Sequence, residues 1–70
     1  MNQSYTAVIK PVQAGWIGWI EEVPGVNCQE PSRELLLASL RETLIEAIEF
    51  NRVDARRAAG QGFEELQIAV

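Results

Sequence analysis

The 70-residue sequence contains no histidine and only one cysteine, Cys28. Without histidine, the chain lacks the usual general base at neutral pH and the commonest metal ligand of proteins. A single cysteine cannot form an internal disulfide, which argues against a small secreted scaffold and fits a reducing compartment. We therefore expect a cytoplasmic protein that is not an enzyme and holds no metal or cofactor. Cys28 is expected to pack as a small apolar side chain.

Long apolar runs and positive charge are also scarce. No run approaches the ~18 apolar residues of a membrane span, and the N-terminus lacks the charged-then-apolar order of a signal peptide. Six Lys and Arg face ten Asp and Glu, so the net charge is −4. Binding to nucleic acid requires clustered basic residues, so direct contact with nucleic acid is not expected. An acidic domain is better suited to a basic protein partner.

The residues that are present predict one α+β domain over residues 1–70, in the order β-β-β-α-β. Strands are expected at residues 4–10, 16–22 and 26–29, with Pro11 ending the first and a turn at residues 13–15. Val23-Pro24-Gly25 has the chemistry of a tight turn. Residues 64–70 alternate apolar and polar side chains, which predicts a half-buried last strand.

A helix is expected from residue 33 to about residue 52, followed by a break at residues 58–62. Ser32 is a suitable N-cap because its hydroxyl can accept a hydrogen bond from the first turn. Apolar residues recur at spacings of three and four and form one stripe, which packs the helix on one face of a small, mostly antiparallel sheet. The stripe consists of Leu36, Leu37, Leu40, Leu44, Ala47 and Ile48.

Some large apolar side chains do not fit a single core. In the second strand, Trp16 and Ile20 share one face, whereas Ile17 and Trp19 share the other. One helix can cover only one of these faces. On the helix, Leu35 and Ile45 lie opposite the apolar stripe. The uncovered side chains therefore predict an interface with a partner or with another copy of the chain. We expect the protein to form a homo-oligomer, either a dimer or a tetramer.

The acidic residues suggest one further function, and the basic residues another. Glu21 and Glu30 could hold a divalent cation in a nuclease-like enzyme. Alternatively, Trp16 could stack on bases beside the basic cluster of Arg52, Arg56 and Arg57, in an RNA-binding regulator. The same residues can be explained without such sites. The acids would be solvated at the surface, Trp16 would pack in a core or an interface, and the arginines would complement the negative end of the helix dipole.

Several short motifs occur in a recognisable order. They are Tyr5, Gly15-Trp16, Val23-Pro24-Gly25, and Ser32-Arg33-Glu34 followed by Leu36 and Leu37. Together with the element order, this pattern resembles the HicB-like antitoxin family over roughly residues 4–52, and more loosely in the last strand. The resemblance implies a fold that is partly RNase-H-like or like a double-stranded-RNA-binding domain. It also implies a cytoplasmic prokaryotic protein of a toxin–antitoxin system.

The function that the resemblance implies is to neutralise a small basic toxin, HicA, which cleaves messenger RNA. The antitoxin would cover the RNA-binding surface of the toxin. No DNA-binding segment follows in this chain, so the resemblance is to short stand-alone members, and repression of its own operon is not expected. The residues expected at the interface with a partner or another copy are Trp16, Trp19, Glu21, Glu22, Glu30, Leu35 and Ile45.

Overall fold

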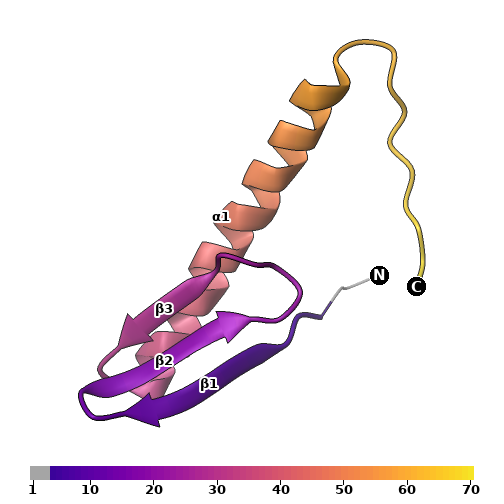
Figure 1. Ribbon diagram of the computed structural model, residues 1–70. Coiled ribbons are helices and arrows are strands. Elements are labelled where there is room, and N and C mark those ends of the chain that lie inside the picture. The colour runs from indigo at the N-terminus through magenta and orange to yellow at the C-terminus, as the bar shows by residue number, and fades with distance from the viewer. Residues whose placement is uncertain (1–3) are drawn as a thin grey trace.

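The computed structural model of the protein describes residues 4–70, which form three strands and one long helix (Figure 1). The strands are β1 (Ala7–Val12), β2 (Gly15–Ile20) and β3 (Asn27–Glu30), and the helix is α1 (Arg33–Ala59). The sheet has the order β1-β2-β3, and both strand pairs are antiparallel. The α+β class and the antiparallel sheet predicted from the sequence are thus confirmed.

The first strand continues through Pro11, which was expected to end it. β1 is an edge strand, and an edge strand tolerates proline when the missing N–H faces away from the neighbouring strand. The Thr6 carbonyl accepts a hydrogen bond from the Glu21 N–H (2.9 Å). Backbone groups alternate in direction along a strand, so residues 8, 10 and 12 also point toward β2. Pro11 belongs to the outward set and costs the sheet no hydrogen bond.

The core lies between one face of the sheet and the first half of α1. It consists of Ile20, Val26, Leu36 and Leu40, each at most 5% exposed, with Trp16, Cys28 and Leu44 among the residues packed around it. Gly18 lets the helix approach closely. A Cβ atom at residue 18 would come within 2.9 Å of Ile9 Cγ2 and 3.0 Å of Leu40 Cδ1.

The N-terminus of α1 is fixed by Ser32, as predicted. Its Oγ accepts a hydrogen bond from the Leu35 N–H (3.2 Å). The helix ends at Gly60, which has a φ of 76°. It is therefore seven residues longer than expected from the sequence, and its second half extends beyond the sheet (Figure 1). No glycine or proline interrupts residues 33–59, so nothing local ends the helix earlier.

The predicted last strand does not form in the structure of the single chain, so this prediction was wrong. Residues 64–70 are extended but pair with no strand, and they return beside the projecting half of α1 toward the start of β1 (Figure 1). Leu66 and Ile68 are 79% and 84% exposed. The helix ends so far from the sheet that this segment does not reach along the edge of β1.

Candidate protein-binding surfaces

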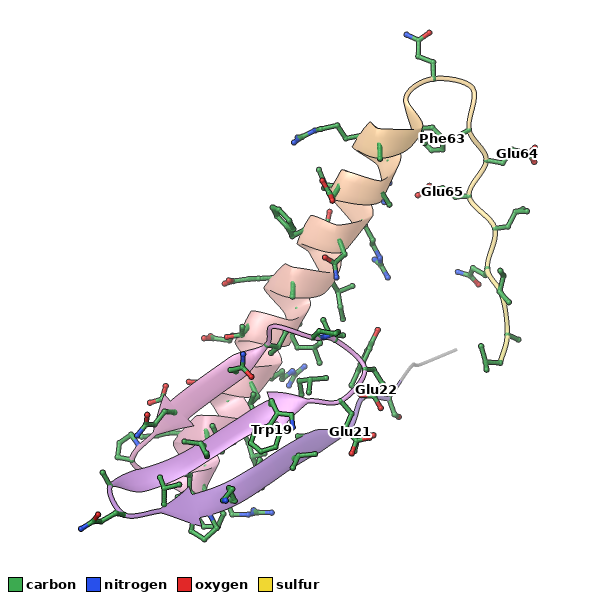
Figure 2. The ribbon with its side chains drawn as sticks, in the orientation of Figure 1. Trp19, Glu21, Glu22, Phe63, Glu64 and Glu65 are labelled. Atoms are coloured by element: carbon green, nitrogen blue, oxygen red, sulfur yellow. The ribbon has the colours of Figure 1, made fainter. Side chains whose placement is uncertain are left out.

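The outer face of the sheet is an apolar surface that no helix or strand among residues 4–70 covers. Because side chains alternate along a strand, the register places Val8, Ile17 and Trp19 on the face opposite to Ile20 and Leu40. Trp19 is 37% exposed and lies on the side of β2 turned away from α1 (Figure 2). Trp16 lies on the helix side, half-buried against the core. The predicted division of the two tryptophans between two faces is confirmed.

Glu21 and Glu22 lie in the loop after β2, not in the strand as expected (Figure 2). The Glu22 carboxylate accepts a hydrogen bond from the Thr6 N–H (2.7 Å). This hydrogen bond stabilises the ionised carboxylate and lowers the pKa of Glu22 below its ordinary value. The loop then turns at Pro24 and Gly25, where the Val26 N–H donates to the Val23 carbonyl (3.4 Å). The φ of 93° at Gly25 fits a type II turn.

Glu30 lies at the opposite end of the sheet from Glu21. It is aligned with Trp16 at the start of β2, whereas Glu21 follows the end of that strand. Its carboxylate accepts a hydrogen bond from the Ser39 hydroxyl (2.6 Å), which ties β3 to α1. The acidic surface predicted around Glu21, Glu22 and Glu30 is therefore divided. Glu21 and Glu30 do not meet, and residues 4–70 contain no cluster of three or more potential metal-ligating side chains.

The helix face opposite to the sheet is a second uncovered surface. We call it the outer helix face, and it consists of Leu35, Ala38, Glu42, Ile45 and Glu49, all exposed. These residues are spaced by three and four, so they form one stripe. Leu35 and Ile45 are 52% and 57% exposed, and acidic residues flank them. The face thus combines apolar contact area with negative charge.

The residues predicted for the interface fall into three separate places. Trp19 lies on the outer sheet face, with Glu21 and Glu22 in the loop that follows β2. Leu35 and Ile45 lie together on the other side of the molecule, on the outer helix face. Trp16 packs against the core, and Glu30 accepts a hydrogen bond from Ser39 of α1, so both side chains make contacts within the chain.

The basic cluster does not join Trp16. Arg52, Arg56 and Arg57 lie in the projecting half of α1, about 30 Å along the helix from its start near Trp16. Arg56 forms an ion pair with Glu65 (2.9 Å), which raises the pKa of the guanidinium. A combined stacking and phosphate-binding site, as the RNA-binding alternative requires, is therefore not assembled within one chain.

The sequence interpretation missed one surface, formed by residues 50–70. Every residue in this range is exposed, including Phe50, Val53, Phe63, Leu66 and Ile68. A space of about 1110 Å³ opens between residues 66–69, the projecting half of α1 and the loop after β2. The sequence did contain a signal for this surface, because no glycine or proline occurs between residues 33 and 59. A helix that continues to residue 59 places the last segment away from the sheet.

α1 is not apolar enough to cross a membrane, and no other helix occurs among residues 4–70. Comparisons of the chain with protein-family models, with curated proteins and with solved structures find no match.

Proposed function

We propose that the chain is a non-enzymatic HicB-like antitoxin domain of the prokaryotic cytoplasm, which works as a homo-oligomer. It neutralises a small basic toxin of the HicA type by covering the surface with which the toxin binds messenger RNA. Three observations support this: the motif order from Tyr5 to Leu37, the net charge of −4, and an uncovered surface that is both apolar and acidic.

The observation that carries the proposal is the composition of the outer helix face. Leu35 and Ile45 supply apolar area, and Glu42 and Glu49 supply negative charge within the same stripe. Two copies of this face would bring like charges together, which opposes self-association. A basic partner gains from both parts of the surface, because opposite charges accelerate the encounter and apolar contacts slow dissociation.

A binding assay with a HicA-type toxin tests the proposal, and a small basic protein encoded next to this gene is the first to try. We expect a complex, inhibition of RNA cleavage at equimolar protein, and an association rate that falls as salt rises. Absence of binding, or binding without inhibition of cleavage, would reject the antitoxin function.

Matched substitutions locate the binding surface. Ile45→Ser and Glu49→Lys are expected to weaken the complex at least about tenfold, which corresponds to about 1.4 kcal/mol. Trp19→Ser likewise replaces an exposed apolar side chain by serine, and Glu21→Lys likewise reverses a charge, both on the sheet side of the molecule. These two variants are expected to change affinity less than about twofold. If the effects are reversed, the toxin binds the outer sheet face, and our assignment of the surface is wrong.

A further inference from the structure

We propose that residues 64–70 of each copy add as a fourth strand to β1 of a second copy, in a reciprocal, two-fold symmetric dimer. The donated segment, EELQIAV, has the alternation of a strand with one apolar side. It is extended and unpaired, and its side chains at Leu66, Ile68 and Val70 are largely exposed. An extended segment of this composition gains backbone hydrogen bonds and apolar burial when it joins a sheet edge.

The acceptor is the outer edge of β1. β1 is a terminal strand of the sheet, and its register leaves the backbone groups of Ala7 and Ile9 pointing away from β2. The edge at β3 is shorter, and α1 is attached to it by Ser39–Glu30 and Thr43–Cys28 contacts. Pro11 lacks an outward N–H, so an added strand would pair with the stretch around residues 7–9.

A segment in the same chain is poorly placed to fill this edge. Residues 50–59 carry α1 about 15 Å past the packed part, and residues 64–70 span only about 23 Å on the way back. The return therefore ends across a space from Tyr5 and the loop after β2, and residues 64–70 do not lie along β1 (Figure 1). The Arg56–Glu65 ion pair holds the start of the segment beside the helix, and Figure 2 shows Glu65 directed toward α1.

The shape of the single chain indicates how much surface a second copy would cover. The radius of gyration is 15.1 Å, against about 11 Å for a compact chain of this length. The accessible surface is 5970 Å², whereas a folded monomer of 7.8 kDa exposes about 4,400 Å². The excess of about 1,600 Å² per copy is the amount that a permanent homodimer interface buries.

Charge also favours a second copy as the occupant. Between residues 50 and 70, three arginines balance Asp54, Glu64 and Glu65, so the charged side chains of this part sum to zero. The net charge of −4 lies entirely in residues 4–49. Two copies can therefore bring their projecting parts together without the like-charge repulsion that the outer helix face would impose, and residues 66–70 of the donated segment carry no charged side chain.

Solution mass combined with two proline substitutions tests the exchange. We expect the wild-type chain at twice its mass of 7.8 kDa. Ile68→Pro removes a large apolar side chain from the apolar side of the added strand and fixes φ near −65° in its middle, and Ala7→Pro removes an outward N–H from β1, so each variant is expected at the monomer mass. Gln61→Pro, in the connection before the segment, is the control and is expected to remain dimeric. Circular dichroism checks that each variant keeps its helix.

Mixing the two defective variants distinguishes the exchange of segments between copies from pairing of the segment within its own chain. The Ala7→Pro chain still donates and the Ile68→Pro chain still accepts, so an equimolar mixture is expected to form a mixed dimer through one exchanged segment. A monomeric wild type, dimers that persist in both variants, or a mixture that stays monomeric would each overturn the proposal. In the wild type, isotope-filtered contacts between residues 66–70 of one copy and residues 7–9 of the other provide a test without substitutions. Their absence from a dimer would also overturn it.

Discussion

The two parts of this small chain differ in almost every physical respect. The packed part, residues 4–49, contains the whole sheet, the first half of α1, every buried side chain and the full net charge of −4. The projecting part, residues 50–70, is exposed throughout, carries balanced charges and makes a single ion pair between its helix and its extended segment.

This difference suggests how stability and binding are divided. Apolar burial stabilises only the packed part, where four side chains form the centre of the core. The projecting part presents Phe50, Phe63 and Ile68 to solvent, so its apolar residues contribute to stability only when another surface covers them. Negative charge on the packed part suits a basic partner, whereas neutrality suits the projecting part to self-association.

The largest effect is expected from truncating the core. Leu36 is 0% exposed, so Leu36→Ala removes buried methyl groups and leaves a cavity. We expect the free energy of unfolding to fall by about 3 kcal/mol, a large fraction of the stability of a 70-residue domain. Leu35→Ala, one residue earlier on the exposed face, should change it by less than about 0.5 kcal/mol. Urea unfolding of both variants measures the contrast, and equal losses would contradict this description of the core.

A smaller loss is expected from filling the close contact at Gly18. The Cβ of Gly18→Ala meets Ile9, Leu40 and the Val8 carbonyl at 2.9–3.1 Å, so the helix or the sheet must shift. We expect a loss of about 1–3 kcal/mol in unfolding free energy. Gly62→Ala has open space around the added methyl group and lies outside the packed part, so its strain at φ 78° should relax locally. If Gly62→Ala costs as much, the two parts unfold as one unit.

The helix cap should contribute less again. Ser32→Ala removes the side-chain acceptor for the Leu35 N–H, and we expect a loss of about 1 kcal/mol. Ser32→Asp keeps an acceptor at the same place and should retain most of the stability. Thermal unfolding of the two variants checks this, and a similar loss in both would show that the cap hydrogen bond contributes little.

The features that the sequence predicted correctly depend on local chemistry. Ser32 caps the helix, Gly25 turns the chain, and Leu36, Leu40 and Leu44 select the buried face. Leu37 was assigned to the same stripe, but it is exposed. The two faces of β2 followed from alternation alone, which is why Trp16 and Trp19 were separated correctly.

The failures depend on pairing over longer distances. Glu21 follows the end of β2 and Glu30 ends β3, so the antiparallel pairing of these strands places the two acids at opposite ends of the sheet. The alternation of residues 64–70 correctly described a segment capable of forming a strand, but strand formation requires a free edge within reach. The length of α1 keeps this segment from reaching the free edge of β1, so the alternation alone could not show whether the strand forms within one chain.

The smallest effect concerns the Glu22 carboxylate at the boundary of the packed part. The Thr6 N–H lowers its pKa below the ordinary value of 4.5, so its contribution to stability is complete above about that pH. As the pH falls through the lowered pKa of the folded state, protonation weakens this hydrogen bond and the contribution disappears. Glu22→Gln should therefore flatten the acid side of the stability profile, measured by urea unfolding between neutral and acidic pH. Glu21→Gln makes the same charge change at a carboxylate that is not the acceptor for Thr6, and it should leave that slope closer to wild type. Equal slopes in the two variants would mean that overall charge, rather than this hydrogen bond, sets the acid response.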